Sequence, residues 1–221
     1  LEQLKNLGKD QEACNLADFY NKVETCTIYW TNQPRPLGFG HAVLAGESFA
    51  DNDEFIVHAG DSLVMPLDSR YVSRMINLSN QNAVVPTLVV ARVEKPSNYG
   101  IVDLNPAAEY PVINDVEEKP AHPKSNLAIM PMYLLNKKIF RYLKSIGPGI
   151  KNEIQLTDAI RLFIKEGNTM RATFLEKNES CIDIGSPSEY YKALNRSYEH
   201  SIGFISGAYQ QKVIGANRAE Y

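Results

Sequence analysis

The stretch that decides the fold covers residues 126–149 and reads NLAIMPMYLLNKKIFRYLKSIGPG. It opens with an apolar run, which predicts a buried strand over residues 126–135. Asn136 then stands where a cap can begin a helix, and Gly147-Pro148-Gly149 ends it. The apolar residues between these two points recur at helical spacing: Ile139, Phe140, Leu143 and Ile146. A strand followed at once by an amphipathic helix is the building unit of α/β folds.

Apolar bursts alternate with helix-period segments on both sides of this unit. Further strands are predicted at residues 55–59, 83–93, 100–104, 110–116, 170–175 and 181–184. Further helices are predicted at residues 68–78 and 156–167, and after the capping box Ser186-Pro187-Ser188-Glu189. The alternation predicts a mainly parallel sheet with helices on both faces. The sequence therefore predicts the α/β fold class.

Length and composition exclude several classes of protein. With 221 residues and 44% apolar content the chain can bury a full core, and we expect one domain over residues 1–221. The net charge of −3 comes from interspersed acids and bases without a basic run, which argues against a nucleic-acid partner. No window approaches the roughly 18 apolar residues of a membrane span, and the first residues do not form a signal peptide. We therefore expect a cytoplasmic protein without a membrane partner.

The cysteines do not suggest a framework or a metal site. Cys14, Cys26 and Cys181 are odd in number, widely separated and lack a Cys-x-x-Cys pair. We expect all three to be reduced packing residues.

Two aspartates follow or end apolar runs. Asp61 comes after the predicted buried strand at residues 55–59, and Gly60 before it lets backbone or a ligand approach closely. Asp183 lies within residues 181–184, where an unpaired buried carboxylate would cost several kcal/mol unless it met a cation or donors. Open α/β sheets place their ligands at this rim, and two rim carboxylates suit Mg²⁺. The alternative is that each aspartate only caps a turn.

Three further segments follow one another along the chain: Asp115-Val116-Glu117-Glu118-Lys119-Pro120, Asn126-Leu127-Ala128-Ile129 and Cys181-Ile182-Asp183-Ile184-Gly185-Ser186-Pro187. The first of them places a carboxylate beside an ammonium. In this order the segments resemble the sugar-1-phosphate nucleotidyltransferases, and within them the glucose-1-phosphate uridylyltransferase branch. The resemblance covers residues 16–194. It implies a three-layer α/β/α, Rossmann-like fold with a mostly parallel mixed sheet.

The resemblance implies an enzyme that forms UDP-glucose and pyrophosphate from UTP and glucose 1-phosphate, with Mg²⁺ as cofactor and a homo-oligomeric state. A thymidylyltransferase that takes dTTP is the alternative within the family. A non-catalytic sugar-phosphate-binding paralogue is another, because it would keep the Glu-Lys pair without a triphosphate loop. A glycosyltransferase-like domain would usually show an Asp-x-Asp pair at a strand end, whereas Asp51-Asn52-Asp53 stands before a predicted strand.

On the sugar side, the resemblance assigns roles to four residues. Tyr99 and Gly100 would pack on the sugar. Glu118 would accept sugar hydroxyls, and Lys119 would meet the phosphate, with Pro120 holding Lys119 in an extended conformation. Lys119 and Asp61 would be catalytic residues, and Asp61 would share Mg²⁺ with Asp183. As a bare tripeptide, Glu-Lys-Pro is more often a solvated strand end. The sequence Val93-Glu94-Lys95-Pro96 is a chance echo, because its flanks do not match.

On the nucleotide side, Gln33 and the segment at residues 36–43 are similar to the part of the family that reads the base. The Gln amide offers a donor and an acceptor to a pyrimidine, and Gly38 would let backbone lie under the ring. A plain turn before a helix at His41 explains the glycines equally well. Asn126 and Glu153 complete the substrate contacts, and residues 153–159 are distinctive for the uridylyltransferase branch. Thr157 and Asp158 in that segment could also be cap residues.

Two features depart from the family pattern. Members begin with a strand and a glycine-rich loop that carries an Arg and a Lys around the triphosphate. That segment is missing here, so we expect an N-terminally truncated fold, with residues 195–221 as a C-terminal helical extension. Pro131 stands where the family more often has Gly. A proline there removes a backbone donor and should alter the strand locally.

Overall fold

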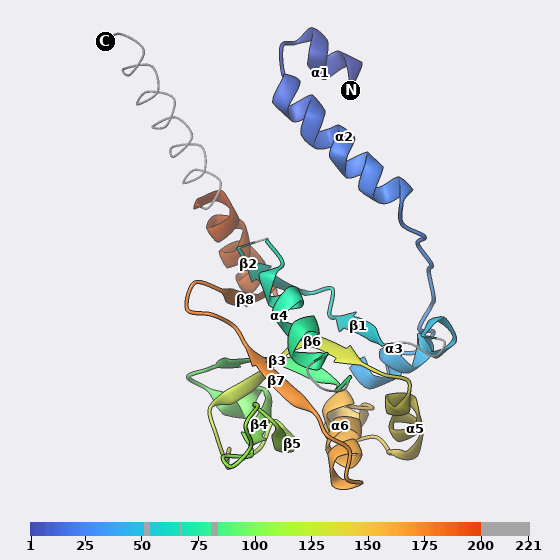
Figure 1. Ribbon diagram of the computed structural model, residues 1–221, viewed down its shortest axis with the longest axis vertical. Coiled ribbons are helices and arrows are strands. Elements are labelled where there is room, and N and C mark those ends of the chain that lie inside the picture. The colour runs from blue at the N-terminus through green and yellow to red at the C-terminus, as the bar shows by residue number, and fades with distance from the viewer. Residues whose placement is uncertain (51–53, 67, 81–83, 200–221) are drawn as a thin grey trace. The chain divides into compact units, whose positions relative to one another are not determined.

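The computed structural model describes residues 1–50, 54–66, 68–80 and 84–199 (Figure 1). It divides the chain into two compact units, residues 1–34 and 35–221. The single domain expected over the whole chain stays a prediction. The expected extension at residues 195–221 is helical up to residue 199, and its remainder lies outside the described residues. The sequence Asp51-Asn52-Asp53 and the predicted strand start at residue 83 also lie outside them.

The first unit contains two helices that the sequence analysis did not predict. They are α1 (Glu2–Asn6) and α2 (Asp10–Glu24). Gly8 makes the turn between them at φ +69°, a conformation that glycine adopts without steric cost. Asp10 and Glu12 begin α2 and Lys22 lies in its last turn, which complements the helix dipole. Cys14 and Cys26 are free but exposed, so the expectation that they are packing residues is wrong.

The second unit is built on a six-stranded sheet. Five strands follow in the order β5 (Ile113–Glu118), β4 (Gly100–Leu104), β6 (Leu127–Leu135), β3 (Thr87–Arg92) and β7 (Arg171–Phe174), and β1 (Phe55–His58) also pairs with β6. β6 is buried along almost its whole length, as predicted from its apolar run. The burial of β1 alternates, so the prediction of a buried strand there is wrong.

Strand directions differ from the prediction. Among the described strands β3 and β7 are the one parallel pair, and the other pairs are antiparallel. The reason is topological: β4 and β5 form a hairpin, and β6 runs antiparallel to three partners. Alternation of apolar bursts with helical segments reveals the fold class, but it does not reveal which strand lies beside which.

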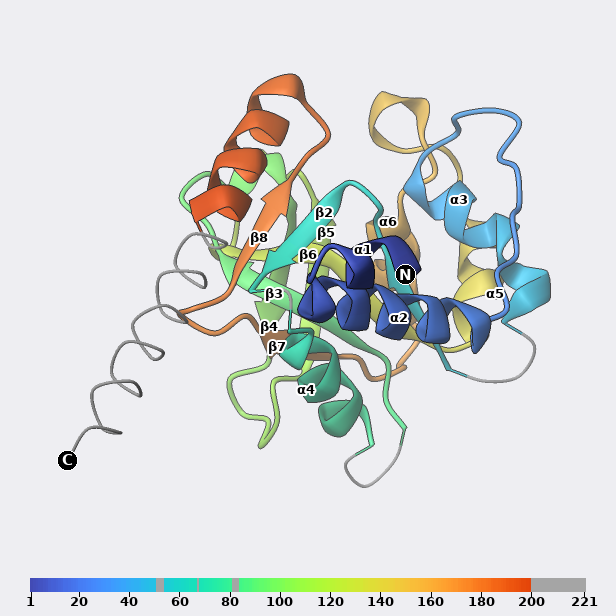
Figure 2. The same ribbon diagram turned by 90° about the horizontal axis from the view of Figure 1, so that it is seen from above.

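A second, two-stranded sheet carries both predicted metal ligands. It pairs β2 (Ser62–Met65) with β8 (Ser180–Asp183), which lie side by side in Figure 2. In this pairing Ser62 lies opposite Asp183. We call this pair the β2–β8 ribbon. Only β8 was predicted, because β2 is four residues long and half exposed. The predicted capping box follows β8: the Ser186 hydroxyl accepts the Glu189 N–H at 3.3 Å, and residues 187–199 are helical.

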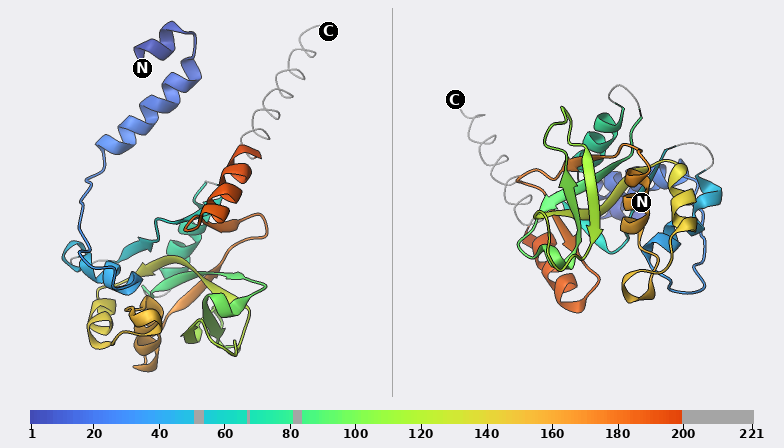
Figure 3. Two further views of the ribbon diagram at one scale, coloured as in Figure 1. Left: turned by 180° about the vertical axis from the view of Figure 1, so that it is seen from behind. Right: turned by 90° about the horizontal axis from the view of Figure 1, so that it is seen from below.

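Helices cover both faces of the large sheet. One face carries α3 (Phe39–Ala45), α5 (Lys138–Ser145) and α6 (Leu156–Lys165), and the other carries α4 (Arg70–Ser79). Short 3₁₀ turns are η1 (Glu47–Phe49), η2 (Pro96–Asn98) and η3 (Ile150–Asn152). Figure 3 shows α3 (blue), α5 (yellow) and α6 (orange) together on one side. The predicted three-layer α/β/α arrangement is therefore confirmed.

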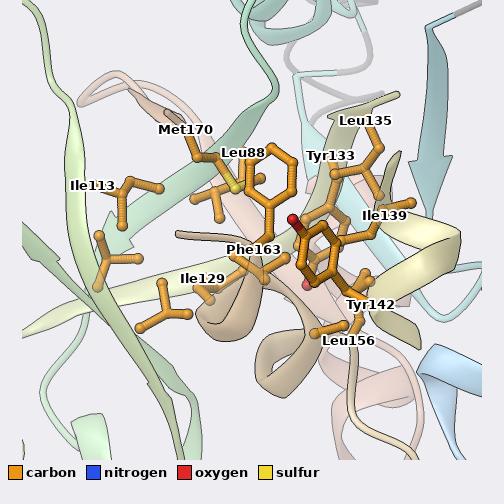
Figure 4. Close-up of a cluster of buried hydrophobic side chains, with 14 of the residues drawn as sticks. Leu88, Ile113, Ile129, Tyr133, Leu135, Ile139, Tyr142, Leu156, Phe163 and Met170 are labelled. Atoms are coloured by element: carbon orange, nitrogen blue, oxygen red, sulfur yellow. The ribbon is translucent and has the colours of Figure 1, made fainter. Parts of the chain in front are cut away.

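The core follows from the alternation of side chains along β6. Ile129 and Tyr133 point to the α5–α6 side, where Phe163 packs edge-on against Tyr142 with ring centroids 5.4 Å apart (Figure 4). Ala128 and Met130 point to the α4 side. Two apolar faces on one strand require helices on both sides of the sheet.

Pro131 alters β6 as expected. The register between β3 and β6 shifts between the pairs Leu88↔Tyr133 and Val89↔Met130, so Pro131 lies in a bulge. Its carbonyl accepts the Ala59 N–H at 3.0 Å. Pro131 and its neighbours in β6 also line a cavity of the second unit.

Candidate functional site

A cavity of about 880 Å³ lies in the second unit, where the ends of several elements meet. It is lined by the ends of β3, β5 and β8 and by the starts of β2, β4, α3 and α6. The helix of residues 187–199 contributes a further wall. This volume can hold a ligand of nucleotide-sugar size.

Glu118 is a largely buried carboxylate at the wall of the cavity. Its side chain is only 12% exposed, and it accepts the Thr157 hydroxyl at 2.8 Å. Gly100 pairs with Glu118 across β4 and β5, and a Cβ added at Gly100 would lie 3.1 Å from both Glu118 Oε2 and Thr157 Oγ1. A side chain at position 100 would therefore crowd the contact between Glu118 and Thr157. Because its hydroxyl holds Glu118, Thr157 is not a helix cap.

Lys119 follows Glu118 in an unusual backbone conformation. Its φ is +41°, so the expectation of an extended Lys119 before Pro120 is wrong. Its backbone N–H donates to the Tyr99 carbonyl at 3.0 Å, which anchors this conformation. Its ammonium lies 3.5 Å from Glu118 Oε1 and is partly exposed to the cavity. A non-glycine residue held at positive φ stores strain, and such residues cluster at functional sites.

The negative charge of Glu118 affects its neighbours. Burial, followed by the Glu118 charge, raises the pKa of Tyr133, which stays a neutral phenol against the cavity wall. Burial and then Glu118 also raise the pKa of Asp158. Phe39 packs on Tyr133 with ring centroids 6.2 Å apart. The cavity thus has one apolar, aromatic wall next to the Glu118–Lys119 pair.

Asp61 and Asp183 come together at one end of the β2–β8 ribbon. A Cβ added at Gly185 would lie 3.0 Å from Asp183 Oδ1 and 3.5 Å from Asp61 Oδ2, so both carboxylates approach the same point. The Ile184 N–H donates to the Asp61 carbonyl at 2.7 Å and fixes this approach. Asp183 is exposed to the cavity, so the expectation that it is buried is wrong.

The turn-capping alternative holds in part. Asp183 Oδ1 accepts the Gly185 N–H at 2.7 Å, which is an Asx-type turn. Burial, followed by the charges of Asp183 and Asp61, raises the pKa of the Cys181 thiol to about 11. The two carboxylates therefore form a local concentration of negative charge that a cation would neutralise.

This pair fits a hard divalent cation. Within the described residues no group of three or more His, Cys, Asp and Glu side chains converges as a closed metal site. Mg²⁺ does not require one, because it binds through one or two carboxylates and completes its shell with water and substrate phosphates. A side chain at position 185 would crowd both carboxylates, so glycine there keeps them accessible.

Three predicted residues of the second unit do not line the cavity, but two of them hold residues that do. Asn126 accepts a hydrogen bond from Arg92 at 2.8 Å, and Arg92 lines the cavity. Glu153 accepts one from Gln155 at 3.1 Å, and Gln155 lines it as well. Arg92 and Gln155 were not predicted as site residues, although Gln155 lies within the segment 153–159 and Arg92 near the end of the strand predicted at residues 83–93.

Gly38 has a packing role that the sequence did not suggest. Its φ is +100°, and an added Cβ would lie 2.7 Å from Glu153 Cβ. The Gly40 N–H donates to the Ile154 carbonyl at 2.9 Å, and an added Cβ there would lie 2.8 Å from the same oxygen. These glycines let residues 36–43 pack against residues 153–156. Gln33 belongs to the first unit and is not placed relative to this cavity.

The helix of residues 187–199 supplies cavity residues that were not predicted. They share one helix face: Glu189, Lys192 and Arg196. Lys192 donates to Glu189 at 2.6 Å. The spacing of the charged residues was the available signal, but a solvated helix face gives the same pattern.

Comparisons with known proteins identify the family of this chain. A sequence profile described as nucleotidyl transferase matches residues 3–200. A UTP–glucose-1-phosphate uridylyltransferase of Bacillus subtilis is 32% identical over 191 residues, which are 85% of this chain and 63% of that protein. A glucose-1-phosphate thymidylyltransferase of Streptomyces griseus is 33% identical over 148 residues, 67% of this chain and 40% of that protein. The chain thus spans less than two thirds of these two relatives.

A solved structure supports the same fold. It is a UDP-glucose pyrophosphorylase complexed with UDP-glucose, with a TM-score of 0.74 and 31% sequence identity. The match covers 84% of this chain and 71% of that one. In the part of the chain that the structure describes, no helix is both long and apolar enough to cross a membrane.

Proposed function

We propose that this chain, which belongs to the nucleotidyl transferase family, acts in the formation of UDP-glucose and pyrophosphate from UTP and glucose 1-phosphate. The observation that carries the proposal is the Glu118–Lys119 pair in the cavity, with the Thr157 hydroxyl at 2.8 Å from the carboxylate. A carboxylate and an ammonium side by side match the hydroxyls and the phosphate of one small ligand.

Glu118 would bind the sugar. An ionised carboxylate only accepts hydrogen bonds, and Thr157 occupies Oε2, so the remaining acceptor positions are available to sugar hydroxyls. Gly100 pairs with Glu118 and Tyr99 precedes it, so both would contact the ring. Lys119 would meet the phosphate, since its ammonium is partly exposed and its contact with Glu118 is long, at 3.5 Å.

Asp61 and Asp183 would hold Mg²⁺ at the end of the β2–β8 ribbon. Their carboxylates supply the hard oxygen donors that this ion prefers, and glycine at position 185 keeps them accessible. When bound, the ion would neutralise phosphate charge. In the full reaction Asp61 and Lys119 would be the residues next to the reacting phosphates.

The chemistry is a displacement at phosphorus. A phosphate oxygen of glucose 1-phosphate attacks the α-phosphorus of UTP and forms a new P–O bond. The bond from the α-phosphorus to the bridging oxygen of the β-phosphate breaks, and pyrophosphate leaves with that electron pair. The protein forms no covalent bond in this scheme. Its residues position the sugar phosphate and balance its charge, which is the main contribution of proteins to phosphoryl transfer.

The nucleotide contacts remain proposals. Gln33 would pair with the pyrimidine edge, and Gly38 would shape the segment around it through its packing on Glu153. Asn126 and Glu153 would act through Arg92 and Gln155. A dTTP-dependent reaction is the second candidate, supported by the 33% identity to a thymidylyltransferase. We also propose a cytoplasmic location and a homo-oligomeric state.

Pyrophosphate release tests the reaction. The protein is incubated with glucose 1-phosphate, Mg²⁺ and one of UTP, dTTP, ATP or GTP. We expect release with UTP first and dTTP second, and UDP-glucose as the product with UTP. A preference for ATP or GTP would contradict the base assignment. Absence of release with all four nucleotides, together with retained glucose 1-phosphate binding, would favour a sugar-phosphate-binding role over the enzymatic one.

A further inference from the structure

Arg74 of α4 contacts three residues of the segment 174–179, the loop that links β7 to β8. Its guanidinium bonds the Glu179 carboxylate, approaches Glu176 Oε1 at 3.4 Å, and donates to the Phe174 carbonyl at 3.4 Å. The Glu176 N–H donates to Glu179 Oε2 at 2.9 Å, which closes the loop on itself. One side chain therefore holds both ends of the segment 174–179. We call this arrangement the Arg74 clasp.

The clasped loop joins the two sheets. β7 ends at Phe174 in the six-stranded sheet, and β8 begins at Ser180 in the β2–β8 ribbon. β8 ends at Asp183, one of the two carboxylates that meet at Gly185. A shift of the loop would move β8 as a unit, because this strand is only four residues long.

The same helix also supports the other strand of the ribbon. Tyr71 and Met75 of α4 are buried in one cluster with Val64 of β2, and Cys181 of β8 packs against that cluster. α4 thus shares an apolar cluster with β2 and reaches the start of β8 through Arg74. Both strands of the ribbon are therefore linked to this helix.

The ion pair within the clasp leaves buried polar atoms without partners. The Glu179 side chain is fully buried, and its Oε1 and Arg74 Nε find no hydrogen-bond partner among the described residues. A buried ion pair with unsatisfied atoms recovers its desolvation cost incompletely. The ion pair does fix geometry, because the planar guanidinium determines where its acceptors lie.

We propose that Arg74 and Glu179 are positioning residues for the Asp61–Asp183 carboxylate pair, so that the affinity of this pair for a divalent cation depends on the Arg74 clasp. The inference rests on the proposed function only in taking these carboxylates as the cation site. Neither residue touches the ion in this scheme. Each acts through the placement of β8.

Binding of Mn²⁺ in the absence of nucleotide tests the proposal. The electron paramagnetic resonance signal of the free ion measures how much Mn²⁺ remains unbound. Arg74→Lys keeps the charge but loses the fork, and Glu179→Gln keeps the shape but loses the charge. We expect each to weaken Mn²⁺ binding on the order of 10-fold, the usual cost of removing a group that orients a metal ligand. Arg70→Lys is the matched control, since Arg70 lies on the same helix but pairs with exposed Asp68.

Thermal unfolding of each variant separates positioning from stability. Ile160→Val provides the comparison, because Ile160 is buried on the opposite face of the sheet, and the change should lower stability without altering Mn²⁺ affinity. If Arg74→Lys and Glu179→Gln lowered stability but bound Mn²⁺ as the wild type does, while Asp183→Asn did not bind it, the clasp would be structural only and the inference overturned. If Asp183→Asn also bound Mn²⁺ normally, the cation site itself would be misplaced, and the inference would fall with it.

Discussion

The Thr157 hydroxyl donates a hydrogen bond to Glu118 at 2.8 Å, and this bond joins the first turn of α6 to the last residue of β5. The residues are 39 positions apart in sequence. The bond holds the carboxylate in one orientation at the cavity wall, with Gly100 leaving the space for it. A sugar hydroxyl would therefore meet an acceptor that is already in place.

Thr157→Val removes this hydroxyl at nearly constant shape. We expect glucose 1-phosphate binding to weaken on the order of 10-fold, because a hydrogen bond to a charged group contributes about 1.5–3 kcal/mol and the freed carboxylate can turn away. Isothermal calorimetry measures the change. Thr87→Val is the control, since the buried Thr87 hydroxyl bonds the Val85 carbonyl outside the cavity. Equal affinities for wild type and Thr157→Val would contradict the role of this bond.

Gly38→Ala should destabilise the protein. The backbone is at φ +100°, and the added methyl would lie 2.7 Å from Glu153 Cβ, so we expect a loss of about 1–3 kcal/mol in the free energy of unfolding. Gly60→Ala is the matched control, because an added Cβ there meets nothing within 4 Å. We expect that change to stay within about 0.5 kcal/mol. Denaturant unfolding of both variants measures these changes. If Gly38→Ala left the free energy of unfolding unchanged, the packing role of Gly38 would be refuted.

The strained backbone at Lys119 predicts that glycine is more stable than alanine at this position, the reverse of the usual order. At φ +41°, Lys119→Gly should be more stable than Lys119→Ala by about 1 kcal/mol, because only glycine occupies this region without cost. Both variants should lose glucose 1-phosphate binding. Lys151, at φ +59° outside the cavity, should show the same order of stabilities with unchanged binding. If Lys119→Ala were more stable than Lys119→Gly, the backbone at position 119 would have relaxed out of the positive-φ region.

Acid should weaken the contact of α6 with β5 through Asp115. Burial opposes ionisation, but the bidentate bond from Arg161 at 2.8 and 2.9 Å, aided by Lys124, lowers the pKa of Asp115 overall. The stability from this pair is present above the unfolded pKa and is lost as pH falls through the lower folded value. Asp115→Asn should therefore be less stable than wild type near neutral pH, and the gap should close below about pH 4. A gap that persisted in acid would contradict the assignment.

Local patterns were enough to predict much of the fold. β6 and α5 were predicted nearly to the residue, because a long apolar run and a clear helical period leave little ambiguity. β2 was not predicted because it is only four residues long and buries only one of its faces, which leaves too short a pattern to recognise. Strand direction also escaped prediction, since β6 pairs with strands that precede it along the chain by different intervals.

The candidate site is readable from sequence only where its residues are neighbours along the chain. Glu118 and Lys119 carry their chemistry as a pair, whereas the conformation of Lys119 depends on the hydrogen bond to Tyr99. Arg74 and Glu179 are 105 positions apart, and each alone is an ordinary charged residue. Contacts of that range arise from the topology, and no local pattern indicates them.

Calorimetric titration of glucose 1-phosphate into wild type, Lys119→Ala and Lys95→Ala tests the central claim most directly. Lys95 stands in a similar Glu-Lys-Pro sequence but does not line the cavity. We predict that Lys119→Ala loses glucose 1-phosphate binding because the phosphate loses its cation, and that Lys95→Ala binds as the wild type does. If Lys95→Ala lost binding and Lys119→Ala kept it, the sugar-phosphate site would not be at Glu118 and Lys119.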